Sequence, residues 1–118
     1  MTFDRLLRIA FWAALAFAFV MAVLPHPPPV PGDPSDKVQH IIAFTVLSGL
    51  AGASYRSTPL LPIGIRLSAF GVLIEIVQAI PILNRNSSVL DWLADTAAVL
   101  IVLVIVALIR RGGRIGAR

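Results

Sequence analysis

The side chains able to do acid–base, ligating or anion-binding chemistry lie in three short motifs on three different segments of the chain. In chain order they are Asp36, Lys37, His40, Glu75, Gln78, Arg85, Asp91 and Asp95. Carboxylates and imidazole serve as general acids and bases, whereas lysine holds phosphate as a point charge and arginine as a planar fork. The chain has no cysteine, which excludes disulfides, thiol nucleophiles and Cys-ligated metals. No metal site and no cofactor is assigned from the sequence.

The composition indicates that these motifs belong to a membrane protein. Of the 118 residues, 58% are hydrophobic and 14% are charged, and the mean hydropathy is +0.88. A soluble domain of this size carries about 25% charged residues. The apolar residues fall into four runs, each near the roughly 20 residues that cross a hydrocarbon core. We therefore expect an all-α fold, a four-helix transmembrane bundle that forms a single membrane domain over residues 1–118.

Turn signals between the runs place the spans at about residues 6–24, 36–54, 60–80 and 88–109. Six prolines within residues 25–34 cannot continue a helix and predict a stiff, extended outer loop over residues 25–35. The first span is expected to remain as an anchor, because no small-x-small cleavage pattern precedes Pro25. Ser35 or Asp36 is a natural N-cap for the second span, and Ser88 with Asp91 fits a capping box for the fourth.

Basic residues near the span ends predict the orientation in the membrane. With both termini on one side, that side holds eight of the ten basic residues, and the other side holds Lys37 and Arg85. We therefore expect both termini in the cytoplasm and the proline-rich and 81–88 loops outside. The net charge of +4 is interpreted as this topology signal and not as a nucleic-acid surface, because no aromatic residues alternate with the basic ones. Tyr55 and Trp92 are expected at the membrane interfaces.

In this topology, three spans place polar side chains in one layer near the outer face. His40 lies in the first turns of the second span, and Glu75 lies about 9 Å below Pro81 at the helical rise per residue. Asp95 lies about 10 Å below Ser88 by the same measure. Charged groups at such depth face the bundle interior and pair with one another, so we expect them to converge. The expected inner stripes are Ser68, Gly71, Glu75 and Gln78 on the third span and Asp91, Asp95, Ala98 and Val102 on the fourth.

The motifs also suggest a family. They read Asp36-Lys37-x-x-His40 at the start of one helix, Glu75-x-x-Gln78 at the end of the next, and Arg85-x-x-Ser88-x-x-Asp91 at the start of the last. In order and placement they resemble the VanZ-like family of small bacterial integral membrane proteins, over roughly residues 36–100. Asp95 stands where an asparagine is expected. The resemblance implies a multi-pass protein of the bacterial cytoplasmic membrane with a cell-envelope role, and the founding member is associated with resistance to the glycopeptide teicoplanin.

The residues leave several functions open. In the first, an outward-facing pocket binds or shields a lipid-linked envelope intermediate, an amphiphilic drug or a lipid headgroup and contributes to glycopeptide resistance. Its ligand-binding residues would be Asp36, Lys37, Gln78, Arg85 and Asp95, with Arg85 also neutralising a carboxylate. In the second, a membrane-embedded hydrolase or transferase acts on an envelope lipid. Glu75 or Asp91 would be its general base, and His40 its acid or a ligand to a divalent metal.

The same polar residues allow two further interpretations, an ion path and a purely structural network. Stacked carboxylates at membrane depth also mark proton or ion paths, but the cytoplasmic halves of the spans are almost wholly apolar apart from Arg66. The polar residues could also form a buried hydrogen-bond network that only fixes helix register. In every case the expected partner is a membrane lipid or a lipid-linked intermediate and not a nucleic acid.

Overall fold

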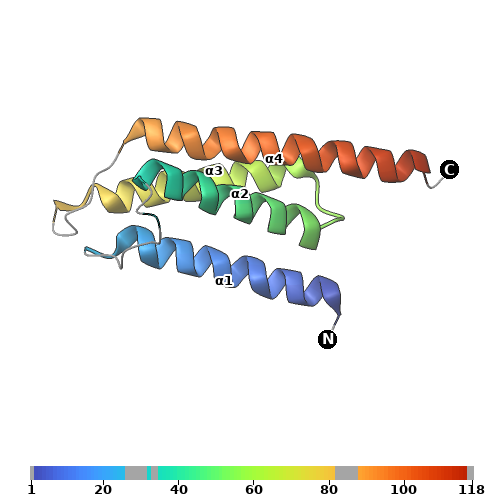
Figure 1. The fold of residues 1–118 in the computed structure, drawn as a ribbon, viewed down its shortest axis with the longest axis horizontal. Helices are drawn as coiled ribbons and strands as arrows, with labels where there is room; N and C mark the ends of the chain where they lie inside the picture. Colours follow the sequence, from blue (N-terminus) through green and yellow to red (C-terminus); the bar gives the residue numbers. More distant parts are fainter. Residues whose placement is uncertain (1, 26–31, 33–34, 82–87, 117–118) are drawn as a thin grey trace.

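The structure, a computed structural model, describes residues 2–25, 32, 35–81 and 88–116 (Figure 1). All four of its regular elements are helices, which confirms the expected fold class. They are α1 (Phe3–Val23), α2 (Asp36–Ser54), α3 (Leu60–Gln78) and α4 (Val89–Gly116). Successive helices run in opposite directions, so the first residues of α1 and the last described turn of α4 lie at the same end of the bundle (Figure 1). This end is called the terminal end below, and the opposite end the site end.

Three of these helices, α1, α3 and α4, are long and apolar enough to cross a membrane. The protein is therefore an α-helical membrane protein. The remaining helix, α2, is as long as α3, with 19 residues. Its first turns, however, carry polar residues such as Lys37 and His40. It nevertheless runs from one end of the bundle to the other, because it joins the site end of α1 to the terminal end of α3 (Figure 1).

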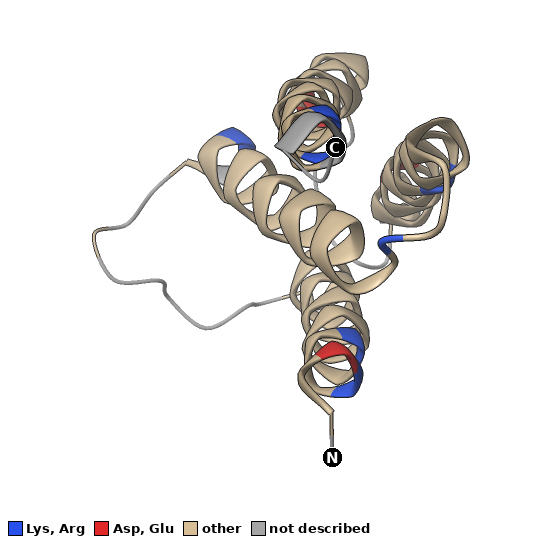
Figure 2. Ribbon diagram, turned by 90° about the vertical axis from the view of Figure 1, so that its right-hand side faces the viewer, with Lys and Arg blue, Asp and Glu red and all other residues tan. Residues whose placement is uncertain are grey.

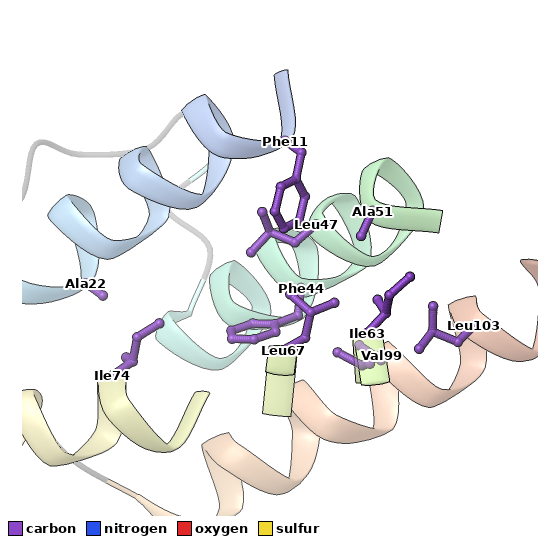
Figure 3. Packing of buried hydrophobic residues seen from close by; sticks show 11 residues of the cluster. Phe11, Ala22, Phe44, Leu47, Ala51, Ile63, Leu67, Ile74, Val99 and Leu103 are labelled. Atoms are coloured by element: carbon purple, nitrogen blue, oxygen red, sulfur yellow. The ribbon is translucent and has the colours of Figure 1, made fainter. Parts of the chain in front are cut away.

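The core forms around α2, which packs against α1, α3 and α4. Phe44 and Leu47, one turn apart on α2, are each 1% exposed and lie among apolar side chains of the neighbouring helices (Figure 3). The outer faces of the bundle are also apolar, with Leu61 74% exposed and Ile101 63% exposed. A surface of this kind suits acyl chains and not water. The buried cluster comprises Phe11, Ala22, Phe44, Leu47, Ala51, Ile63, Leu67, Ile74, Ala98, Val99 and Leu103.

Basic residues gather at the terminal end (Figure 2), and two of them, Arg8 and Arg110, hydrogen-bond the C-terminus of α2. The last carbonyls of a helix have no donors within it. Arg8 Nε donates to the carbonyl oxygen of Ser54 over 3.3 Å. Arg110 Nη2 donates to the carbonyls of Gly52 and Tyr55, each over 3.1 Å. These arginines therefore do more than set topology, and α4 continues past its expected end near residue 109 to Gly116, with Arg110 held on α2.

Replacing Arg110 with alanine is expected to lower the free energy of unfolding by about 1.5–3 kcal/mol, the range for hydrogen bonds to a charged group. The substitution leaves carbonyls of α2 and of the following turn, including that of Thr58, without their donors. Arg111→Ala is the matched control, because Arg111 is exposed on the same helix. Equal unfolding midpoints for the two variants in a detergent titration would contradict this role of Arg110.

Candidate functional site

The site end begins with the first turns of α2. Ser35 is the N-cap, as expected, and its Oγ accepts a hydrogen bond from the Val38 backbone N–H over 3.2 Å. His40 follows in the second turn and is 7% exposed. Lys37 is exposed at the same end. Asp36 is the first residue of the helix, and its side chain lies outside the described part of the chain.

The last turns of α3 bring Glu75 into the bundle. Glu75 is 8% exposed and lies on the expected inner stripe, where Gly71 and Gln78 are also buried. Its Oε2 accepts a hydrogen bond from the Ser88 backbone N–H over 2.8 Å. This bond joins the end of α3 to the residue that precedes α4, and it leaves Oε1 as the oxygen of Glu75 that faces α2.

His40, Glu75 and Asp95 meet in the interior, and we call them the acid–histidine cluster. Asp95, in the second turn of α4, is 0% exposed, and its Oδ2 lies 3.3 Å from His40 Nδ1. The same nitrogen lies 3.8 Å from Glu75 Oε1. One ring nitrogen and one oxygen from each carboxylate all lie within 4.8 Å of one another. Three separate helices thus place an imidazole and two carboxylates at one point, where each can exchange protons with the others or hold a cation.

Asp91 is buried one turn before Asp95, but it is not one of the groups that meet at His40. The expected capping box forms only in part. Ser88 Oγ accepts from the Leu90 backbone N–H over 3.1 Å, whereas the Ser88 N–H, which a capping box directs to Asp91, is bonded to Glu75. Glu75 of α3 thus accepts the hydrogen bond that was expected to go to Asp91, because the end of α3 lies close to the start of α4.

Gln78 and Arg85 are placed differently from the cluster. The Gln78 side chain is 0% exposed, and its Nε2 donates to the carbonyl oxygen of Ala22 over 3.0 Å. Ala22 lies in the last turn of α1, where a carbonyl needs an outside donor, so Gln78 fastens α3 to α1. A ligand-binding role for Gln78 stays a prediction. Arg85 lies outside the described residues.

Trp92 links α3 and α4 beside the cluster. The residue lies near the start of α4, its ring is half-buried, and its Nε1 donates to the carbonyl oxygen of Ser68 over 3.1 Å. Ser68 Oγ also lies 3.0 Å from Thr96 Oγ1. Sequence reasoning missed Trp92 and Thr96 as parts of the site. The signal that was available is Gly71, a small residue that lets Trp92 approach α3.

Replacing Gly71 with alanine is expected to destabilise the protein by about 1–3 kcal/mol, the usual range for overpacking. The added Cβ would lie 3.2 Å from Trp92 Cδ1 and 3.5 Å from Asp95 Oδ2, and the hydrogen bond of the indole prevents the ring from moving away. Gly112→Ala is the control, because a Cβ there meets nothing within 4 Å and alanine favours a helix by about 1 kcal/mol. A Gly71→Ala variant as stable as Gly112→Ala in thermal unfolding would refute the close packing.

An open groove runs along the outside of the cluster between α3 and α4. Its volume is about 420 Å³, and its lining comprises Val72, Glu75, Ile76, Ala79, Val89 and Trp92. All of these except Glu75 present apolar surface or an aromatic ring. The groove opens on the apolar outer face of the bundle, and Glu75 connects it to the acid–histidine cluster.

The fold and this site define the class of protein: an α-helical membrane protein with a buried acid–histidine cluster behind an apolar groove. Comparisons with protein-family models, with curated proteins and with solved structures gave no match to the chain.

Proposed function

We propose that this protein binds a lipid-linked or amphiphilic ligand of the cell envelope, with an apolar chain in the groove between α3 and α4 and a polar group at Glu75. The observation that carries the proposal is the position of Glu75, which lines the groove and also belongs to the acid–histidine cluster. Glu75 is the polar residue in an otherwise apolar lining. A hydroxyl or ammonium group of a ligand that lies in the groove can hydrogen-bond the Glu75 carboxylate there.

The wider setting of the proposal follows from the resemblance to VanZ-like proteins. In that setting the protein lies in the bacterial cytoplasmic membrane with both termini inside, and the site end faces outward. Lys37, exposed at this end, is then available to a phosphate of the same ligand. The ligand would belong to the lipid-linked intermediates of the cell wall or to amphiphilic drugs, and its binding would contribute to glycopeptide resistance.

The test is to identify the lipids that the purified protein retains in polymer-bounded membrane discs. Ala79→Trp fills the groove, and we expect it to deplete a lipid that the wild-type protein enriches at least tenfold over the bulk membrane. Ala107→Trp adds the same bulk to an exposed position of α4 and serves as the control. A wild-type lipid profile equal to that of the bulk membrane would exclude a resident lipid ligand, and equal profiles in the two variants would exclude the groove.

A second candidate function is a membrane-embedded hydrolase or transferase that acts on such a lipid. The contact between His40 Nδ1 and Asp95 Oδ2 favours it, because a carboxylate that orients an imidazole is the arrangement of general acid–base catalysis. Asp91 is a further candidate for the base, because the Ser88 N–H is bonded to Glu75 and not to Asp91. Product formation from the retained lipid that stops in His40→Ala would support catalysis, whereas retention without turnover would limit the protein to binding.

A further inference from the structure

We propose that the acid–histidine cluster is a divalent metal site of the Zn²⁺ class, with His40, Glu75 and Asp95 as its protein ligands. The donor atoms lie close to the spacing that an ion requires. Two ligands at about 2.0–2.1 Å from a tetrahedral Zn²⁺ lie about 3.3 Å from each other. The distances from His40 Nδ1 are 3.3 Å to Asp95 Oδ2 and 3.8 Å to Glu75 Oε1, so small side-chain rotations bring the set onto one ion.

The charge of the cluster also points to a divalent cation. Two carboxylates meet at one imidazole here, and all three side chains are at least nine-tenths buried. Like charges at this separation in an apolar interior repel each other strongly. One divalent ion cancels both charges. A combination of imidazole with carboxylate oxygens favours Zn²⁺ over Mg²⁺, which prefers oxygen ligands and keeps its waters.

A hydrogen bond from the backbone orients Glu75, as is usual for a metal-binding carboxylate. Metal-binding carboxylates and imidazoles are oriented by hydrogen bonds from groups outside the coordination sphere. The Ser88 backbone N–H bonds Oε2 of Glu75, which fixes the carboxylate with Oε1 toward His40. Three protein ligands leave one position of a tetrahedral ion open. Because Glu75 also lines the groove, the ion would stand beside the proposed lipid site, where an oxygen of a headgroup can reach it.

The test uses the full chain in detergent, stripped of metal with a chelator and then equilibrated with Zn²⁺ alone or Mg²⁺ alone. We expect one Zn²⁺ per chain by elemental analysis, a rise in the thermal midpoint with Zn²⁺, and no rise with the same concentration of Mg²⁺. His40→Ala and Asp95→Asn should retain less than a tenth of this metal. Asp4→Asn is the control, because Asp4 lies on α1 outside the cluster and pairs with Arg56, and this variant should bind Zn²⁺ as the wild type does.

Other results would overturn the proposal. They are a wild-type protein that retains no Zn²⁺, and cluster variants that retain it fully. Zn²⁺ binding that appears only after Arg85→Ala would also overturn it, because the guanidinium of the chain itself would then supply the counter-charge. Co²⁺ titrated into the wild type gives a second measurement that needs no variant, since tetrahedral binding produces intense visible absorption. Ala79→Trp separates the two proposals, because it should remove the lipid and leave the metal content unchanged.

Discussion

Replacing Asp95 with alanine is expected to lower the free energy of unfolding by about 3–5 kcal/mol, the cost of removing one member of a buried charged pair. Asp95 is 0% exposed, and its Oδ2 lies 3.3 Å from His40 Nδ1. The substitution removes this contact and leaves a cavity at a fully buried position. Asp4→Ala is the control, because Asp4 pairs with Arg56 on the surface and surface pairs contribute at most about 1 kcal/mol. Reversible unfolding in mixed micelles measures both variants.

A double-mutant cycle separates the contact from the cavity. Hydrogen bonds between membrane helices contribute about 0.6 kcal/mol on average and up to about 1.7 kcal/mol in such cycles. For His40→Ala and Asp95→Ala we expect a coupling energy near the upper value, because both side chains are buried. Additive effects of the two substitutions would show that His40 and Asp95 do not interact in the folded protein.

Glu75→Gln and Glu75→Ala are expected to differ sharply, because the two oxygens of Glu75 have different tasks. Glutamine keeps an oxygen that can accept the Ser88 N–H, so its stability should stay within about 1 kcal/mol of wild type. Alanine removes this acceptor and should cost about 1–3 kcal/mol, the penalty for an unpaired buried group.

Ligand binding should follow a different order from stability in these two variants. Both lack the negative charge toward His40, so retention of the lipid enriched by the wild type should fall at least tenfold in both. Thermal unfolding and lipid analysis of the same preparations measure the two effects together. If Glu75→Gln retained the lipid at the wild-type level, hydrogen bonding and not charge would be the function of Glu75 toward the ligand.

Much of the fold follows from patterns in the sequence. The bounds of α2 agree with the span expected at residues 36–54, because Ser35 caps the start and a turn with Pro59 follows the end. The inner stripes of α3 and α4 agree for most of their members. Buried are Gly71, Glu75, Gln78, Asp91, Asp95 and Ala98, whereas Ser68 and Val102 are half-buried. The cost of a lone charge in hydrocarbon leaves few alternatives. The same reasoning therefore predicted that Glu75, Asp95 and His40 would converge.

Details that depend on the relative height of two helices could not be predicted in this way. Asp91 and Asp95 are both inward residues of α4, and only the depth of α3 decides that Glu75 and His40 meet Asp95 alone. The bond from Gln78 to Ala22 depends on where α1 ends beside α3. The hydrogen bonds of Arg110 depend on a helix that runs past its last apolar residue. Each is a contact between different helices, which periodicity along one helix does not encode.

The central position of α2 has a consequence for biogenesis. Its polar first turns make it the least hydrophobic of the four helices, so it partitions poorly into lipid alone. We therefore expect α2 to insert stably only once neighbouring helices shield His40. During synthesis, α2 should therefore stay at the insertion machinery until α3 has emerged. The two helices should then enter the membrane together as a hairpin beside α1. A ribosome-bound chain that ends within α3 would then leave α2 accessible to water-soluble labels.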